Sequence, residues 1–331
     1  MNLSVIICTY NRANMISNVL DDLHRQIVPQ DLAWEVLIID NNSTDNTKAL
    51  VETHVKRSAY PIRYIFEPRQ GKSHALNTAI EKSEGSILAF TDDDVNVDPH
   101  WVSAVHSIFN QYDCMGMAGR IRAVWNVPKP MWLAGEGPDR ITGALVEFEF
   151  GDKPCLLTEP GFGANMAFRR VVFEKYGGFQ TALGPFGYSL HSRIPAARGG
   201  EDVELFSRVI QAGEKIIYSP SALIFHPVEK ERTQKRYFKR WYFSWGRSWV
   251  RKEGMPEDAP GLAGVPRYMF RVLLDRFIQW AFTFNLRSRF SKKLKLYLAL
   301  GQIIEAYSLA HKPSPKAGKQ ALVPSENRGD R

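Results

Sequence analysis

Cysteine is scarce in this chain, with only three among 331 residues. The three, Cys8, Cys114 and Cys155, are far apart in the sequence and form no CxxC pair. An odd number of widely spaced cysteines argues against a disulfide framework, and the missing pair argues against a thiolate zinc site. We therefore expect the protein to work in a reducing compartment.

Long apolar runs are also missing. No segment reaches the roughly 20 apolar residues of a membrane-spanning helix. The nearest candidates, 269–284 and 294–310, are short or interrupted by charged residues such as Arg271 and Glu305. The apolar run 3–8 has no basic segment before it and leads into polar residues, which is unlike a signal peptide. We expect a cytoplasmic protein.

Several nucleotide-binding and hydrolase motifs are absent as well. The sequence Gly71-Lys72-Ser73 resembles the end of a phosphate-binding loop, but the earlier glycine that the motif requires is replaced by Phe66. Gly161 and Gly163 lack the third glycine of a dinucleotide-binding fingerprint. No HExxH or GxSxG sequence occurs. These absences argue against a P-loop NTPase, a metalloprotease and an α/β-hydrolase.

The composition that is present, with 44% hydrophobic and 24% charged residues, is typical of a folded globular protein. The net charge of +8 is unevenly distributed. Residues 1–228 contain 21 basic and 26 acidic residues, whereas residues 229–331 contain 22 basic and 9 acidic residues. The positive surplus that would attract an anionic partner therefore lies in the last third of the chain.

The first hundred residues alternate between strand and helix patterns, which predicts an α/β fold with a parallel sheet. The expected strands are 3–8, 35–39, 62–66 and 87–90, and the expected helices are 14–26, 44–55, 73–83 and 99–110. Polar clusters at 9–12, 40–45 and 92–94 each follow a strand. Because ligands bind beyond the carboxyl ends of parallel strands, the three clusters predict one shared site.

The middle of the chain, 112–200, is rich in glycine, proline and tryptophan and shows no clear periodicity. We expect it to form a variable wall of the site rather than part of the sheet core. A helix is expected after Gly199-Gly200, and strands are expected at 216–218 and 222–225, the second of which leads to His226.

Acidic residues at two predicted strand ends are candidates for ligand binding. Asp92-Asp93-Asp94 places three acidic side chains in sequence, which repel one another unless a cation compensates them. Mg²⁺ is commonly held by one or two carboxylates together with substrate phosphates. Asp40 could accept hydrogen bonds from a nucleobase or ribose. The alternatives are a solvated acidic loop for the triple aspartate and a helix cap for Asp40.

A pair of adjacent carboxylates, Glu201 and Asp202, follows two glycines at a predicted helix start. An ionised carboxylate near a hydroxyl can act as a general base. From spacing alone, plain helix capping is the stronger interpretation. His226 stands alone after an apolar strand, where a structural role is more common than a ligand role.

The sequence from 237 to 252 interleaves aromatic and basic residues, and 269–284 has one apolar helical face. These segments could lie on an anionic membrane, pack on the rest of the protein or on a partner chain, or bind nucleic acid. We favour a membrane surface over packing and expect no nucleic acid partner. We expect a helical extension over 229–311 and a disordered tail over 312–331.

A series of ordered motifs over residues 1–250 resembles the family 2 glycosyltransferases, which have the GT-A fold. The motifs are VIICTYNR, EVLIIDNNSTDNT, GKSHALNTAI, ILAFTDDDV, PGFGANMAFRR, KYGGF, GGEDVELFSRV and ALIFHP. The resemblance implies a Rossmann-like mixed sheet flanked by helices over residues 1–228. It also implies an inverting transfer of a sugar from a nucleotide-sugar, typically a UDP-sugar, with Mg²⁺ or Mn²⁺.

The resemblance also assigns roles to residues of the donor site. Thr9 and Tyr10 would line the nucleobase pocket, and Asp40 would bind the base. Asp92 would lie near the ribose and the metal, with Asp93 at the permissive middle position of the DxD motif. Asp94 would ligate the metal.

The remaining roles come from the later motifs. Asp202 would be the general base, and Glu201 beside it is placed with the donor-binding residues. His226 would reach the metal or the pyrophosphate. Gly163 and Asn165, within PGFGAN, would line the donor sugar.

The chain departs from the family at Leu76-Asn77, because many relatives have an arginine before this asparagine. A donor contact from that arginine would have to come from Arg69 or Lys72. The expected acceptor is a carbohydrate or lipid-linked molecule of bacterial surface polysaccharide, glycolipid or glycoconjugate synthesis, reached from the inner face of the cytoplasmic membrane. The alternatives are a nucleotidyltransferase on a related sheet and a non-catalytic binding module.

Overall fold

The computed structural model describes residues 1–133, 142–184, 199–256 and 260–311. Within these residues, nine strands form one mixed sheet with the order β3-β2-β1-β4-β8-β6-β9-β5, and β7 pairs with β9. The strands are β1 (Leu3–Thr9), β2 (Trp34–Asp40), β3 (Ile62–Phe66), β4 (Ile87–Thr91), β5 (Asn96–Val97), β6 (Gly116–Trp125), β7 (Cys155–Leu156), β8 (Asn165–Arg169) and β9 (Ile216–Val228).

The N-terminal half of the sheet is parallel, as the apolar runs predict. Strand β1 lies between β2 and β4 and is parallel to both. Val5, Ile6 and Ile7 are buried, because a parallel sheet is covered by helices on both faces. The predicted α/β sheet is confirmed in this region, and all three strands end at the same edge.

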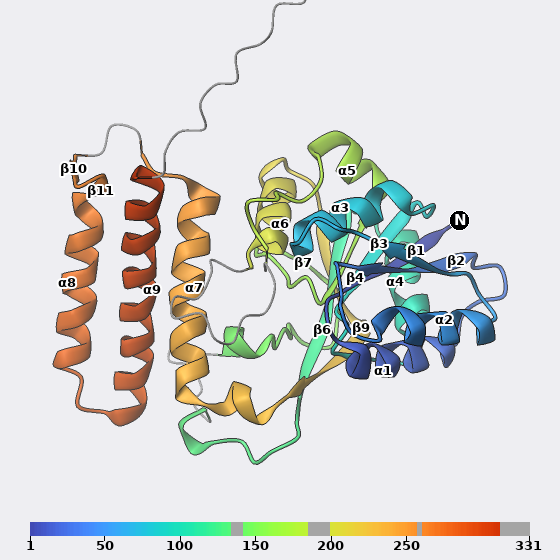
Figure 1. The fold of residues 1–331 in the computed structure, drawn as a ribbon, viewed down its shortest axis with the longest axis horizontal. Helices are drawn as coiled ribbons and strands as arrows, with labels where there is room; N and C mark the ends of the chain where they lie inside the picture. Colours follow the sequence, from blue (N-terminus) through green and yellow to red (C-terminus); the bar gives the residue numbers. More distant parts are fainter. Residues whose placement is uncertain (134–141, 185–198, 257–259, 312–331) are drawn as a thin grey trace, which may run out of the picture.

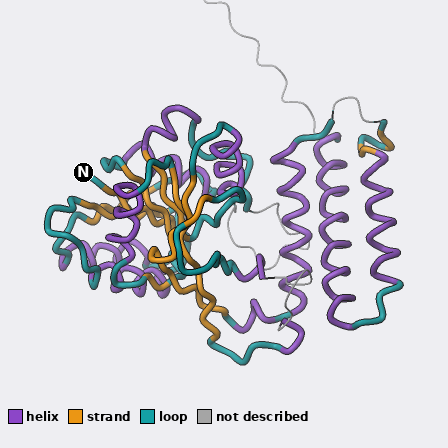
Figure 2. Tube along the Cα trace, turned by 180° about the vertical axis from the view of Figure 1, so that it is seen from behind, coloured by secondary structure: helices purple, strands orange, loops and turns teal. Residues whose placement is uncertain are grey.

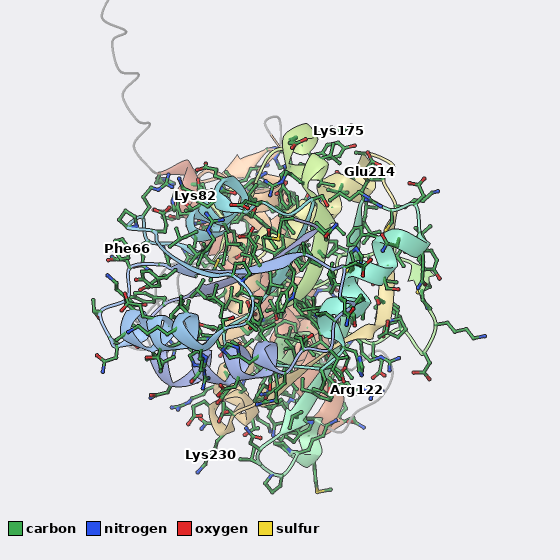
Figure 3. The ribbon with its side chains drawn as sticks, turned by 90° about the vertical axis from the view of Figure 1, so that its right-hand side faces the viewer. Phe66, Lys82, Arg122, Lys175, Glu214 and Lys230 are labelled. Atoms are coloured by element: carbon green, nitrogen blue, oxygen red, sulfur yellow. The ribbon has the colours of Figure 1, made fainter. Side chains whose placement is uncertain are left out.

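Helices cover both faces of the sheet (Figure 1). They are α1 (Ala13–His24), α2 (Thr47–Arg57), α3 (Lys72–Lys82), α4 (Trp101–Gln111), α5 (Arg170–Tyr176) and α6 (Glu201–Gln211). In Figure 1, α1 and α2 lie below the sheet, whereas α3 and α5 lie above it. Lys175 of α5 and Glu214 after α6 lie close together in Figure 3 and form an ion pair of 2.8 Å, which joins these two segments.

The expectation that residues 112–200 stay outside the sheet core is wrong. Strands β6 and β8 lie between β4 and β9, and Met166 and Phe168 of β8 are buried. A β-carbon on Gly119 would lie only 2.3 Å from Nδ2 of Asn165, and one on Gly116 would lie 2.6 Å from the Phe168 ring. Gly116 and Gly119 make β6 look unlike a strand in the sequence, and they allow β8 to approach it closely in the sheet.

The C-terminal region forms a separate layer of three helices, α7 (Lys235–Glu253), α8 (Arg267–Ala281) and α9 (Leu286–Ala310). Figures 1 and 2 show them side by side, with α7 nearest the sheet and α8 farthest from it. Among the described residues, no helix combines the length and hydropathy that crossing a bilayer requires. The predicted disordered tail, 312–331, lies outside the described residues.

Helices α7 and α9 are held together by close backbone packing and a buried ion-pair network. A β-carbon on Gly246 or on Gly301 would lie 2.1 Å from a carbonyl oxygen of the other helix. Glu305 of α9 is fully buried and accepts hydrogen bonds of 2.6 Å from both Arg247 and Arg251 of α7. Part of the basic charge of α7 is therefore neutralised inside the protein.

The aromatic residues of α7 contribute more to packing than the sequence interpretation allowed. Phe238 is fully buried and packs in a cluster that includes Leu133, Leu145 and Val228 of the α/β region, residues 1–228. The Tyr237 hydroxyl donates to the carbonyl of Ala144 at 3.1 Å. Helix α7 therefore lies against the α/β region. This leaves α8 and the turn after it as the exposed part of the layer.

We expect Glu305→Gln to lower the free energy of unfolding by about 3 kcal/mol, because removing one member of a buried ion-pair network leaves the remaining charges uncompensated. Urea unfolding followed by circular dichroism measures this loss. Glu253→Gln, which changes an exposed carboxylate at the end of α7, should alter stability by no more than about 0.5 kcal/mol. Equal stability of the two variants would contradict the role of Glu305.

Candidate active site

The three polar clusters after β1, β2 and β4 emerge at one edge of the sheet. Thr9 pairs in register with Asp40, and Ile7 pairs with Thr91. Asp40 is buried and accepts hydrogen bonds from the Tyr64 hydroxyl at 2.6 Å and from the Ser43 N–H at 2.9 Å. A carboxylate has about four lone-pair positions, so Asp40 retains capacity for a ligand. Thr9 is buried beside it, and Tyr10 is half-buried.

The triple aspartate is surrounded by basic side chains from distant parts of the sequence. Asp92 binds Nζ of Lys72 at 2.6 Å, and Arg12 binds Asp93 at 2.7 Å and Asp94 at 2.8 Å. Burial raises the pKa of Asp92, but Lys72 has the opposite effect and the net pKa lies below the ordinary value. Burial raises the pKa of Asp93 to about 6, although Arg12 opposes this rise.

Asp94 and His226 lie together at the metal position that the sequence predicts. Oδ1 of Asp94 is 3.8 Å from Nε2 of His226, and Oδ2 of Asp94 is 3.1 Å from Arg232. Burial, together with Arg232, lowers the pKa of His226, so its ring is neutral at pH 7 and can donate a lone pair to a metal. Mg²⁺ and Mn²⁺ accept such mixed oxygen and nitrogen ligands when substrate phosphates complete the coordination.

Asp94 and His226 could supply two of the ligands that a divalent ion needs. Within the described residues, no group of three His, Cys, Asp or Glu side chains is arranged to hold an ion. The donor set of one carboxylate and one imidazole therefore fits a divalent ion that arrives with a diphosphate, and it does not fit a permanently bound structural ion.

Asp202 is fixed at the start of α6 by two backbone groups. Gly199 and Gly200 have φ values of 85° and 92°, which only glycine adopts readily, and they turn the chain into the helix. Asp202 accepts hydrogen bonds from the N–H groups of Gly163 at 2.7 Å and Val203 at 2.8 Å. Burial raises the pKa of Asp202, and these N–H groups oppose that rise.

Glu201 has a different environment from its neighbour. It is 4% exposed, and its Oε2 atom has no hydrogen-bond partner among the described residues. Burial and the nearby Asp202 charge raise the pKa of Glu201 to about 7. The adjacent carboxyl groups can therefore differ in protonation near neutral pH, with Asp202 the better candidate for an ionised base.

Gly163 and Asn165 have distinct roles in this geometry. Gly163 positions Asp202, and a β-carbon at this residue would lie 3.2 Å from Oδ2 of Asp202. The Asn165 amide donates to the carbonyls of Arg120 and Ala222 and accepts from the Trp101 indole at 2.9 Å. These contacts give Asn165 a structural role between strands, so we leave it out of the proposed donor site.

The sequence model of Glycosyl transferase family 2 matches residues 4–177, which is more than half of the chain. The chain belongs to this family. It is 25% identical over 233 residues to succinoglycan biosynthesis protein ExoM of Rhizobium meliloti, covering 70% of this chain and 69% of that protein. It is 38% identical over 226 residues to glycosyltransferase AglE of Haloferax volcanii, covering 68% and 66%.

Solved structures support the fold of this glycosyltransferase. The mannosyltransferase PcManGT from Pyrobaculum calidifontis, solved with GDP-Man and Mn²⁺, aligns with a TM-score of 0.53 at 21% identity, covering 93% of this chain and 74% of that one. S. aureus TarS 1-349 in complex with UDP aligns with a TM-score of 0.50 at 14% identity, covering 93% and 92%. The predicted GT-A fold is confirmed.

Two basic residues of the candidate site, Arg12 and Arg232, were not among the site residues predicted from the sequence. Arg232, six residues after His226, contacts both Asp94 and the His226 ring. Arg69 and Lys72 were the two candidates to replace the arginine that is missing at Leu76. Arg69 is bound by both carboxylate oxygens of Glu67, and its side chain is 61% exposed. Lys72 instead binds Asp92 in the candidate site. The available signal for Arg232 was its position shortly after the ALIFHP motif.

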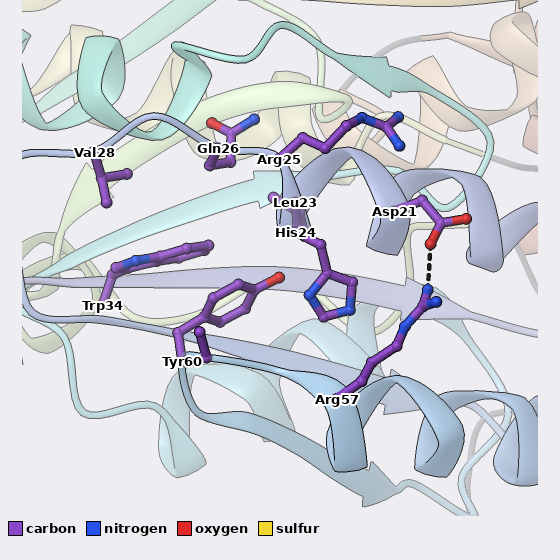
Figure 4. A pocket seen from close by; sticks show the side chains of 10 residues that line it. Asp21, Leu23, His24, Arg25, Gln26, Val28, Trp34, Arg57 and Tyr60 are labelled. Carbon is purple, nitrogen blue, oxygen red and sulfur yellow. Dashed lines mark hydrogen bonds and ion pairs between the residues drawn. The ribbon is translucent and has the colours of Figure 1, made fainter.

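A hollow of about 500 Å³ lies at the start of β2, the end opposite Asp40 (Figure 4). Trp34, the first residue of β2, stacks on Tyr60 with ring centroids 4.0 Å apart, and Arg57 forms an ion pair with Asp21. No predicted site residue lines this hollow. Because Asp40 lies at the opposite end of the same strand, the hollow is separate from the site of the glycosyltransferase.

Proposed function

We propose that the chain is an inverting, metal-dependent glycosyltransferase that moves a sugar from a nucleotide-sugar, most simply a UDP-sugar, to an acceptor hydroxyl. The observation that carries this proposal is the grouping of Asp94, His226 and the Lys72–Asp92 pair around the same edge as Asp202. Thr91, which directly precedes Asp92, pairs with Asn165 of β8, and the N–H of Gly163, two residues before Asn165, donates to Asp202. These contacts link the predicted donor and base residues.

In this proposal, Thr9, Tyr10 and Asp40 hold the nucleobase, and Asp92 and Asp93 lie beside the ribose. A divalent ion held by Asp94 and His226 would neutralise the charge of the leaving nucleoside diphosphate. Arg12 and Arg232, which bind Asp94 in this structure, are positioned to contact the diphosphate oxygens.

Asp202 would take the proton of the acceptor hydroxyl as that oxygen attacks the anomeric carbon. Its Gly163 and Val203 contacts hold the carboxylate in one orientation, so its remaining lone pairs face a defined direction. Glu201 would support the donor sugar, since a protonated carboxyl group can donate a hydrogen bond to a sugar hydroxyl. A direct displacement of this kind inverts the configuration and needs no covalent nucleophile.

A panel of nucleotide-sugars tests the donor. In the presence of Mn²⁺, we expect one nucleotide class among UDP-, GDP- and dTDP-sugars to raise the melting temperature, because a ligand at 100 times its Kd stabilises the folded state by about 2.7 kcal/mol. A shift with GDP-sugars alone would replace the UDP assignment. No shift with any of the three classes would contradict the nucleotide-sugar site.

For the acceptor, we propose a carbohydrate or lipid-linked molecule of surface polysaccharide, glycolipid or glycoconjugate synthesis. The relative ExoM is named for succinoglycan biosynthesis, which supports this class. We also propose that the enzyme is cytoplasmic and contacts the inner face of the cytoplasmic membrane through α8 and the turn after it.

The exposed residues of this edge support the membrane proposal. Phe282 and Phe284 in the turn after α8 and Leu286 at the start of α9 are 73%, 88% and 81% exposed. The segment 267–311 contains eight Lys and Arg residues against two Asp and Glu residues. Arg289 and Lys293 lie over the Trp280 ring at 5.5 and 5.4 Å. Exposed aromatic residues beside a basic surplus complement an anionic lipid surface.

We expect the full chain to float with vesicles containing phosphatidylglycerol and not with pure phosphatidylcholine. Replacing Phe282, Phe284 and Leu286 with serine should reduce the floated fraction at least about tenfold, because each buried apolar side chain contributes about 1.5–3 kcal/mol. Leu156→Ser, which changes an exposed apolar residue of β7, serves as the control. Undiminished flotation of the triple variant would place the contact elsewhere.

A further inference from the structure

Helix α7 has two distinct faces. One face packs against α9 through Gly246 and Arg247. The other faces the α/β region: Trp241 lies near Gly143, Trp245 lies near Gly200, and Nζ of Lys252 lies 3.2 Å from the Ser207 hydroxyl of α6. The second face of α7 therefore runs alongside the helix that carries Asp202.

Two tryptophans on this second face form a stacked pair. The rings of Trp241 and Trp245, one helical turn apart, have centroids separated by 5.6 Å and planes inclined by only 10°. Both side chains are half-buried. Trp241 packs at the edge of the cluster around Phe238, whereas Trp245 belongs to none of the apolar clusters of the described residues.

The position of Trp245 relates it to the base. A β-carbon on Gly200 would lie 3.7 Å from Cζ3 of Trp245. Gly200 immediately precedes Glu201 and Asp202 at the start of α6. Trp245 therefore lies next to the residue that precedes this carboxylate pair.

We infer that Trp245, supported by Trp241, is the surface on which the sugar ring of the acceptor stacks. The C–H bonds on one face of a pyranose ring pack favourably against an indole, and its hydroxyl groups remain available for hydrogen bonds. The reacting hydroxyl therefore belongs to a glycosyl residue rather than to a bare lipid phosphate. This inference rests on the proposed glycosyltransferase function and names the chemical class of its acceptor.

Simple packing between helix and domain does not explain the pair. Phe238, on the same helix, is fully buried in an apolar cluster and fulfils the packing role. Trp245 is as large as a core residue, yet it is only half-buried and lies beside the glycine that precedes the carboxylate pair. Large aromatic walls with a few convergent polar groups are typical of small-molecule sites.

The experiment compares four variants in two assays. Donor hydrolysis without acceptor is followed by release of nucleoside diphosphate, and transfer is measured with a panel of methyl and octyl glycopyranosides and with a polyprenyl phosphate. Trp245→Ala and Trp245→Leu should raise the acceptor KM at least tenfold and leave the donor KM and hydrolysis rate within twofold of the parent. Trp245→Phe should retain most of the acceptor affinity, and Tyr112→Ala, which removes an exposed aromatic ring after α4, should match the parent.

Other results would overturn the inference. An unchanged acceptor KM in Trp245→Ala, or equal values for the leucine and phenylalanine variants, would show that no ring stacks on this residue. Donor hydrolysis with no transfer to any glycopyranoside would reject the sugar acceptor and leave the donor site intact. No hydrolysis of any nucleotide-sugar by the parent chain would instead contradict the proposed function itself.

Discussion

Asp202→Asn is expected to lower the rate of sugar transfer about 10³-fold, because a positioned general base typically contributes 10²–10⁴-fold to such a reaction. Asparagine keeps a carbonyl oxygen for the Gly163 N–H, so the start of α6 should retain its geometry. The loss should therefore appear in kcat, whereas the affinity for the nucleotide-sugar changes little. Initial rates across donor concentrations, together with thermal stabilisation by the donor, measure both quantities.

The matched control for this variant is Asp113→Asn, which makes the same chemical change at an exposed residue after α4. It should transfer sugar at the parental rate. If Asp202→Asn also retained the parental rate, the base would have to be assigned to another group, and Glu201 would be the first to test. A loss of donor binding in the asparagine variant would indicate that Asp202 holds the donor instead.

Asp94→Ala is expected to reduce the Mn²⁺-dependent part of UDP binding at least about tenfold and transfer at least about a hundredfold, since the variant loses the carboxylate of a two-ligand metal site. Binding without metal should stay the same or become tighter. The reason is that Arg12 and Arg232 lose a carboxylate partner and gain access to phosphate oxygens. Titration calorimetry with and without Mn²⁺ separates the two contributions.

The comparison with the parent chain decides this prediction. The increment in affinity that Mn²⁺ gives to the parent should be absent from Asp94→Ala. The same increment in both proteins would remove Asp94 from the metal site, and His226 would then have no carboxylate partner there among the residues we assign.

The parallel half of the fold and the main site could be predicted because their signals are local. Each buried parallel strand is a short apolar run, and the polar residues directly after it must lie at the strand's carboxyl end. Asp40 is the last residue of β2, and Asp92 directly follows β4. Because β1 lies between β2 and β4 and is parallel to both, the polar clusters at the ends of these strands lie together whatever their side chains contact.

The remaining features depend on contacts between residues far apart in the sequence. Arg232 and Asp94 are separated by 138 positions, and nothing in either segment alone indicates their hydrogen bond. Asn165 was placed in the donor site by the resemblance of its PGFGAN motif to the family, yet its amide satisfies two carbonyl groups between strands. Strand β6 was hidden by Gly116 and Gly119, whose close approach to β8 is visible only when that neighbouring strand is in place.

The charge of the C-terminal region illustrates the same limit. The sequence shows the basic surplus but not which cations are exposed. Arg247 and Arg251 are directed toward the buried Glu305, so α7 contributes less surface charge than its composition suggests. The contact with lipid is consequently assigned to α8 and its turn, and the face of α7 beside α6 is left for the acceptor.

The most direct test of the central proposal is ³¹P NMR of the products formed from the stabilising nucleotide-sugar with Mn²⁺. We expect a nucleoside diphosphate to accumulate with the parent chain and to be nearly absent with Asp202→Asn. Release of inorganic pyrophosphate would identify a nucleotidyltransferase, and no turnover of a bound donor under any metal condition would identify a binding module. Either result would contradict a glycosyltransferase that uses Asp202 as its base.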